Sequence, residues 1–223
     1  MSYPQTIIKM RPKKHLSSYC QHFILTNDKV IRVALKDYLK KSCSAIPNTK
    51  IIEELGITHG AARVDIAVVN GCIHGYELKS DKDTLNRLPG QIEIYNSVLD
   101  KITLVVGKSH LYEAIKIIPE WWGITIAKII NSDQTVSLCN IREPKQNPKP
   151  DYIAVAALLW REEALSILEE LNKADGVRSK TRSIIYERLS KELTGQKLKE
   201  RVRECLQART NWRSGLQYIP CDG

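Results

Sequence analysis

The sequence lacks the features that define several large classes of protein. It has six cysteines but no Cys-x-x-Cys pair, and no histidine stands at zinc-finger spacing, which argues against a structural zinc or an iron–sulfur cluster. No apolar run reaches the roughly 20 residues that cross a membrane. The N-terminal MSYPQTIIKMRPKKH has no apolar core of a secretory signal. We therefore expect a cytoplasmic protein with free thiols and no membrane contact.

Positive charge is abundant and unevenly spread. The net charge is +9 at pH 7, and the excess of basic residues lies in 1–50 and again in 173–213, whereas 51–150 is nearly neutral. Basic surfaces commonly bind polyanions, so the expected partner is nucleic acid, with DNA preferred. A solvated surface that only aids solubility is the alternative.

Hydrophobic periodicity divides the chain into four parts. Residues 1–26 form a basic arm without a clear period, and 27–142 alternate between helical and strand patterns in the order α-β-β-β-α-β-α-β. A proline-rich stretch without apolar residues predicts a linker at 143–150, and 151–223 is predicted to be helical and basic. The first helix is expected to begin at the Thr26-Asn27 cap. The pattern predicts an α/β protein with a C-terminal helical extension.

The segment VDIAVVNGCIHGYELKS is typical of a β-hairpin, because two alternating runs flank Asn70-Gly71. A two-residue turn would place Asp65 and Glu77 on opposite faces of the sheet. A three-residue loop over 69–71, closed by Gly71 in the left-handed conformation, would place Asp65, Glu77 and Lys79 on one face. A shared site therefore requires this loop or a compensating bulge.

Two carboxylates on neighbouring strands suit a hard divalent cation. Asp65 and Glu77, with the carbonyl of Leu78, would supply oxygen ligands for Mg²⁺, for which Mn²⁺ can substitute. The cation would stabilise charge on a phosphate and lower the pKa of a bound water. Lys79 is expected on the same face, where it can orient that water or neutralise a transition state. These residues are the predicted catalytic and metal site.

The pattern Asp65-x11-Glu77-x-Lys79 resembles that of the PD-(D/E)XK nuclease superfamily. The resemblance implies a restriction-endonuclease-like αβββαβ core around a central mixed sheet. Gln91-x3-Tyr95 looks like the extra motif of the RecB-like branch, in which both residues help to hold metal and substrate. Members often use an acidic residue upstream of the aspartate, and Glu54 is preferred here over Glu53. The proline that usually precedes the aspartate is absent.

The resemblance extends further along the chain. From about Asn27 to Arg213 the sequence resembles a family of uncharacterised bacterial proteins assigned to the same superfamily. The cysteine clusters of the iron–sulfur members are missing, which argues against the exonucleases of CRISPR adaptation and recombination. Arg63 is expected to pair with Glu77 or to contact phosphate.

The leading functional hypothesis is a Mg²⁺-dependent deoxyribonuclease, an endonuclease or exonuclease gated by a regulatory protein partner and acting in bacterial defence against foreign DNA. Its basic C-terminal residues, among them Arg178, Lys180 and Arg182, would grip the nucleic-acid backbone or dock a partner subunit. An RNA-cleaving nuclease of the same fold is one alternative. A non-catalytic nucleic-acid-binding or assembly subunit is another, although a site without a function would be free to lose buried charges that cost stability.

Overall fold

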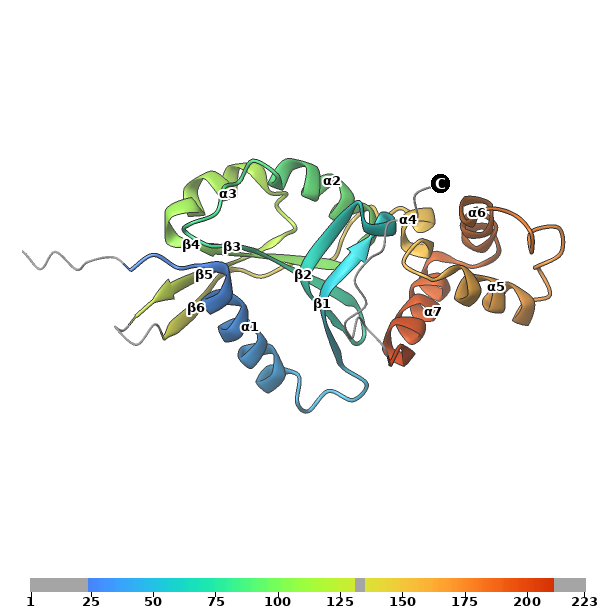
Figure 1. The fold of residues 1–223 in the computed structure, drawn as a ribbon, viewed down its shortest axis with the longest axis horizontal. Coiled ribbons are helices and arrows are strands. Elements are labelled where there is room, and N and C mark those ends of the chain that lie inside the picture. The colour runs from blue at the N-terminus through green and yellow to red at the C-terminus, as the bar shows by residue number, and fades with distance from the viewer. Residues whose placement is uncertain (1–23, 131–134, 211–223) are drawn as a thin grey trace, which may run out of the picture.

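A six-stranded mixed sheet, with its strands in the order of the chain, organises the protein (Figure 1). The computed structural model describes residues 24–130 and 135–210. The strands are β1 (Lys50–Ile57), β2 (Ala62–Val69), β3 (Ile73–Lys79), β4 (Lys101–Gly107), β5 (Gly123–Ile129) and β6 (Val136–Arg142). Strands β3, β4 and β5 are mutually parallel, whereas the β1–β2, β2–β3 and β5–β6 pairs are antiparallel.

Helices cover both faces of the sheet and extend beyond one end of it (Figure 1). The helix α1 lies on one face, with α2 and α3 on the other, and the C-terminal helices pack beside β1 and β2. The helices are α1 (Asp28–Ser42), α2 (Leu88–Val98), α3 (Leu111–Ile117), α4 (Tyr152–Ala156), α5 (Arg161–Glu170), α6 (Arg182–Glu192) and α7 (Gly195–Ala208), with short 3-10 turns η1 (Thr58–Gly60) and η2 (Lys108–His110). This arrangement confirms the predicted mixed α/β fold, its αβββαβ order and its C-terminal helices.

Two apolar clusters hold these layers together. The smaller one joins the buried face of α1, namely Ile31, Leu35 and Leu39, to one face of the sheet. The larger one fills the opposite face under α2 and α3 and continues without a break into α4–α7. Because burial of apolar side chains is the main stabilising term in folding, the C-terminal helices are part of one core with the sheet.

The first helix begins where the sequence predicts. The side-chain oxygen of Asn27 accepts a hydrogen bond of 3.1 Å from the backbone N–H of Val30, which satisfies one of the free donors at a helix start. Asp28 lies in the first turn, and Lys40 and Lys41 in the last, so the charges complement the helix dipole. The start of α1 and the charges that stabilise its two ends can therefore be recognised in the sequence.

Two elements differ from the expected pattern. The antiparallel edge strand β6 was not predicted, because its sequence VSLCNIR does not keep a regular alternation of apolar and polar residues. The apolar stretch after Asp151 forms two helices, since the carboxylate of Glu163 accepts a hydrogen bond of 2.7 Å from the backbone N–H of Trp160 and begins α5 there. The Asp151 side chain caps α4, as expected.

The predicted linker at 143–150 packs against the rest of the protein. The stretch 143–150 lies against the sheet region, where the backbone N–H of Asn147 donates to the carbonyl of Asp100 at 2.8 Å. Asn147 is buried, and its amide donates to Leu99 at 2.8 Å. The expected basic arm lies outside the described residues except for 24–26. The division into four parts stays a prediction.

Candidate active site

The hairpin of β2 and β3 decides which side chains meet. Val69 pairs with Ile73 and Val68 with His74, so the loop has three residues, as a shared site requires. The loop spans 70–72, one residue later than expected, and Gly71 does not adopt the left-handed conformation, which corrects both details of the prediction. The regular pairing of β2 with β3 ends at Ile66 and Tyr76, and just beyond it Asp65 and Glu77 line one pocket, where Asp65 contacts α1 and Glu77 contacts α2.

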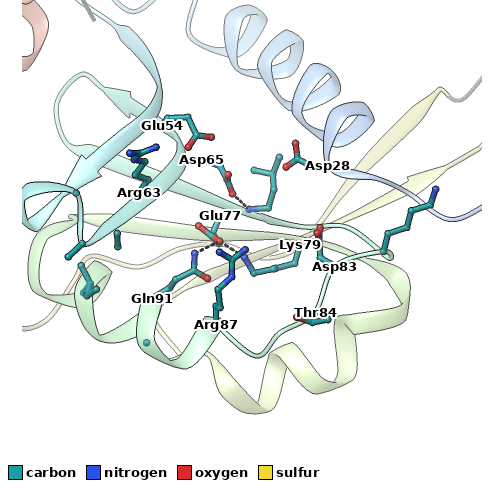
Figure 2. A pocket seen from close by; sticks show the side chains of 17 residues that line it. Asp28, Glu54, Arg63, Asp65, Glu77, Lys79, Asp83, Thr84, Arg87 and Gln91 are labelled. Atoms are coloured by element: carbon teal, nitrogen blue, oxygen red, sulfur yellow. Dashed lines mark hydrogen bonds and ion pairs between the residues drawn. The ribbon is translucent and has the colours of Figure 1, made fainter. Parts of the chain in front are cut away.

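Glu77 and Lys79 form a buried ion pair. Their side chains are 2% and 8% exposed, and the Lys79 ammonium donates to Oε1 of Glu77. From α2, Gln91 Nε2 donates to the same oxygen at 2.6 Å, and the Tyr95 hydroxyl lies 2.8 Å from Oε2. The hydroxyl also lies 2.5 Å from the carbonyl oxygen of Arg63. Three donors from two elements, β3 and α2, therefore hold the Glu77 carboxylate. Figure 2 shows two of them, Lys79 and Gln91.

Asp65 is held by the neighbouring strand and by a residue of α1. Its Oδ2 accepts from the backbone N–H of Leu78 at 2.8 Å, and its Oδ1 accepts from the Arg32 guanidinium at 2.7 Å. Arg32 also pairs with Asp28 and Glu54, each at 3.1 Å. The acidic floor of the site is therefore neutralised by two cations, Lys79 beside Glu77 and Arg32 beside Asp65.

The surroundings shift the proton affinities of these groups. Burial, and then the charge of Asp65, raises the pKa of Glu77, although Lys79 opposes the shift. Burial and the neighbouring Glu77 carboxylate raise the pKa of Tyr95, so its hydroxyl keeps its proton. Burial alone would lower the pKa of Arg32, but the hydrogen bonds and charges of Asp28 and Asp65 together outweigh it, and the net shift is upward.

Glu54 has a backbone conformation that is rare for a residue with a side chain. Its φ is 54°, in the left-handed region, and it lies in β1 between residues that pair regularly with β2. Such a conformation costs about 1–3 kcal/mol and is found most often at functional sites. It accompanies the turning of the carboxylate toward Arg32 and the pocket, whereas the side chain of Glu53 pairs with Lys36.

These side chains line an open pocket of about 890 Å³. Its rim carries three exposed cations, Arg63 from β2 and Lys82 and Arg87 from the loop between β3 and α2. Figure 2 shows Arg63 and Arg87. Within the described parts of the chain, none of the three forms an ion pair with an acidic side chain. The pocket thus combines an acidic floor with a basic rim.

The structure brings most of the predicted site residues together. The pocket is lined by Glu54, Arg63, Asp65, Glu77, Leu78, Lys79 and Gln91, and Tyr95 contacts Glu77 from below the surface. The predicted nucleic-acid-binding residues Arg178, Lys180 and Arg182 lie apart, in and before α6, and do not line the pocket.

Sequence reasoning missed Arg32, Asp28, Lys82 and Arg87. The first two stand four residues apart at the start of α1, a spacing that places them on one face, and this was the available signal. Lys82 and Arg87 lie in an irregular loop, where sequence spacing gives no direction for a side chain.

The donor set fits a magnesium-type cation. Mg²⁺ is commonly held by one or two carboxylates and keeps several waters, so Asp65, Glu77 and the Leu78 carbonyl suffice as protein ligands. Oε1 of Gln91 is buried and has no hydrogen-bond partner among the described residues, which leaves an oxygen acceptor available at the site. In the same residues, no group of three or more His, Cys, Asp or Glu side chains is placed to hold a metal ion.

The fold and site define a mixed α/β protein with a charged, carboxylate-floored pocket at one end of a hairpin. The family model for bacteriophage P4 protein cII matches residues 21–217 of this sequence. The chain therefore belongs to the bacteriophage P4 protein cII family.

This membership corrects the family inferred from the motif. The resemblance to the PD-(D/E)XK nuclease superfamily is wrong as an identification, and the nuclease function on DNA or RNA and the role in defence that followed from it are wrong as well. Four residues at fixed spacing define the local geometry of two strands and a helix. They do not define a family, because the same local geometry serves unrelated functions.

Two individual proteins are similar to parts of this chain. Protein cII of Enterobacteria phage P4 is 31% identical over 108 residues, which cover 48% of this chain and 40% of that protein. The match thus spans about two fifths of the curated relative. A protein of unknown function from Silicibacter pomeroyi is 16% identical, with 68% of this chain and 94% of the other covered and a TM-score of 0.39, a likeness too low to support an argument.

Among the described residues, no helix is both long and apolar enough to cross a bilayer. Cytoplasmic localisation stays a prediction.

Proposed function

We propose that this protein binds nucleic acid at the pocket between α1, β2, β3 and α2, with a divalent cation, Mg²⁺ or Mn²⁺, as its cofactor. Asp65, Glu77 and the Leu78 carbonyl would hold the cation, which supplies positive charge for a phosphate oxygen. The observation that carries the proposal is the meeting of two fixed carboxylates with a rim of cations that have no acidic partner among residues 24–130 and 135–210.

The rim supplies the contacts to the nucleic-acid backbone. Arginine guanidinium groups match phosphate geometry with two parallel donors, and Arg63 and Arg87 stand on opposite sides of the acidic floor (Figure 2). Such contacts position a backbone without reading its sequence. Lys82 adds a third charge from the loop, so we expect binding that depends strongly on salt.

The C-terminal cations support binding less well than the rim does. Arg178 is engaged with Glu169 and Asp175, and Arg201 with Glu170 and Glu204. DNA is the preferred ligand, as the basic composition suggests. A regulatory protein partner stays a prediction, for which the exposed apolar side chains of Ile153, Trp160 and Ile184 are the available surface.

Fluorescence anisotropy with labelled duplex DNA, single-stranded DNA and RNA of one sequence tests this proposal. Binding should be tighter with Mg²⁺ or Mn²⁺ than with EDTA, and Asp65→Asn should remove that difference. Arg63→Gln and Arg87→Gln should each weaken binding and reduce the slope of log affinity against log salt by about 1. Lys191→Gln, an exposed site on α6 with the same change of charge, is the control. The proposal would be contradicted if the affinity for nucleic acid were the same with and without the divalent cation and were unchanged in both rim variants.

Enzymatic activity is a separate proposal about the same pocket. It is supported by the burial of Glu77 beside Lys79, since buried ion pairs seldom stabilise a fold and shifted pKa values gather at functional sites. Recovering the labelled nucleic acid after incubation with Mg²⁺ and protein, and comparing its mass with the starting material, tests for any covalent change. If the nucleic acid is recovered unchanged and its binding still depends on the cation, the protein binds nucleic acid without catalysing a reaction on it.

A further inference from the structure

Arg32 is the one cation that reaches the acidic floor from the helix α1. Its guanidinium donates to Oδ1 of Asp65 at 2.7 Å and to the Asp65 carbonyl at 3.2 Å. We propose that Arg32 is a positioning residue that competes with the divalent cation for Asp65, so that cation binding and the contacts of α1 are coupled. This inference rests on the proposed function of the pocket.

The two oxygens of Asp65 have partners of different kinds. Oδ2 accepts from the backbone N–H of Leu78 at 2.8 Å, and this donor belongs to β3 and cannot leave without opening the strand pair. Oδ1 accepts from a side chain, which can move by changing its rotamer. A divalent cation that binds Oδ1 of Asp65 must therefore displace the Arg32 guanidinium.

Arg32 has two further acidic partners that do not depend on its contact with Asp65. Its Nε and one terminal nitrogen donate to the two oxygens of Asp28, each at 3.1 Å, one helical turn earlier. Its other terminal nitrogen lies 3.1 Å from Glu54. Because these two carboxylates remain, the guanidinium stays neutralised when the cation takes its place at Asp65.

The conformation of Glu54 supports the same assignment. A left-handed φ in the middle of a strand is unfavourable, and here it accompanies the ion pair with Arg32. In the register of β1 with β2, Glu54 lies opposite Asp65, and Arg32 pairs with both carboxylates. The protein thus holds Arg32 at the pocket by three acids on three elements, α1, β1 and β2.

Isothermal titration of the purified full chain with Mn²⁺ tests the coupling. Arg32→Met removes the competing charge and keeps much of the side-chain volume, so Mn²⁺ should bind about 5-fold to 150-fold tighter, the usual range for coupled sites. Lys36→Met is the matched control, since Lys36 lies one turn further along α1 and pairs with Glu53, outside the pocket. The control makes the same change of net charge and should leave the affinity close to that of the wild type.

A merely structural role for Arg32 predicts the opposite sign. If Arg32 only holds the pocket together, its loss should weaken Mn²⁺ binding. Binding by a folded Arg32→Met protein that equals or is weaker than that of the wild type therefore overturns the inference. Circular dichroism and a thermal melt establish whether the variant is folded.

A second variant covers the case in which Arg32→Met does not fold. Arg32→Lys keeps the charge, but a single ammonium lacks the planar fork that contacts Asp28 and Asp65 together. Mn²⁺ should again bind tighter than in the wild type, by a smaller factor, and unchanged or weaker binding overturns the inference.

The titration also separates this inference from the proposed function. If the wild type binds Mn²⁺ in a way that Asp65→Asn abolishes, and Arg32→Met binds equally well, only the competition by Arg32 is wrong. If neither protein binds Mn²⁺, the cation site itself is wrong and the inference fails with it. Binding by Arg32→Met alone supports both.

Discussion

Charged side chains surround the pocket and also cover the helices α5–α7, but the two regions hold their charges differently. In the pocket, ion pairs join residues far apart in the sequence, as Arg32 and Asp65 do, and Glu77 and Lys79 are almost fully buried. On the helices, three of the ion pairs join residues within one turn, and in one of these, Lys197 with Glu200, both side chains are exposed. A charge withdrawn from water is costly unless its partner is fixed, whereas an exposed pair is worth little. The same residue types therefore have different consequences in the two regions.

The largest expected effect comes from breaking the buried pair. Lys79→Met leaves the Glu77 carboxylate without its cation, and we expect the free energy of unfolding to fall by about 3–5 kcal/mol. Adding Glu77→Gln to this variant should restore much of the loss, because the buried charge is then gone. Urea unfolding near neutral pH measures both. Lys197→Met on α7 is the control, and the comparison between the regions fails if it costs as much as Lys79→Met.

The buried histidine His74 is expected to make the stability of the protein depend on pH. His74 lies under α1, where its ring nitrogens contact the Thr103 hydroxyl at 2.9 Å and the Tyr76 hydroxyl at 3.1 Å. Burial, and then the charge of Lys101, lowers the pKa of His74 to about 4. The unfolded chain therefore binds a proton between pH 6.5 and 4 that the folded chain does not, and the stability falls by up to about 3 kcal/mol as the pH falls through this range.

Denaturant unfolding at a series of pH values from 7 to 4 measures this effect. In His74→Gln the decrease in stability over the range should be smaller by that amount, because no imidazole remains to take up the proton. Equal pH profiles for the variant and the wild type would show that His74 is not the group responsible. Exposed charges on α5–α7 predict no comparable dependence.

An intermediate effect is expected at Asp81, which joins three segments beside the pocket. Its carboxylate accepts hydrogen bonds from the backbone N–H and hydroxyl of Thr26, at 2.9 and 2.7 Å, and from those of Ser109, at 2.9 and 2.7 Å. Burial raises the pKa of Asp81, but these hydrogen bonds outweigh it, so the pKa lies below its ordinary value. The stability that the carboxylate contributes is therefore present above about pH 4 and is lost as the pH falls through the lowered pKa.

Asp81→Asn should lower the free energy of unfolding by about 1–3 kcal/mol at neutral pH, since an amide cannot accept all four hydrogen bonds. A double-mutant cycle with Thr26→Val measures the part that belongs to this contact. Additive losses in the two variants would mean that Thr26 and Asp81 do not act together.

The smallest effect is expected on the exposed side of the C-terminal helices. Arg178 pairs with Asp175 and Glu169, but its side chain is 58% exposed. Arg178→Ala should leave the free energy of unfolding nearly unchanged, because solvent screens both pairs. The same urea titration measures it. A loss as large as that at Asp81 would remove the contrast between the two regions.

The sequence by itself determined the features that depend on short-range periodicity. Side chains alternate along a strand, so Glu77 and Lys79, two residues apart in β3, had to share one face, and the hairpin around Asn70-Gly71 brought Asp65 of β2 near them. The helical period similarly placed Gln91 and Tyr95 one turn apart, where both contact Glu77. The order of helices and strands up to β5 follows from the same patterns.

Only the tertiary structure decided which distant charges meet. Arg32 comes from a helix on the other face of the sheet, and its contact with Asp65 depends on how α1 packs through Ile31 and Leu35. Glu54 adopts a left-handed backbone conformation that no local pattern predicts. Packing also holds Arg178 away from the pocket, although its residue type suggested a shared role. Local periodicity fixes the direction of a side chain within one element, whereas contacts between elements depend on the burial of apolar faces along the whole chain.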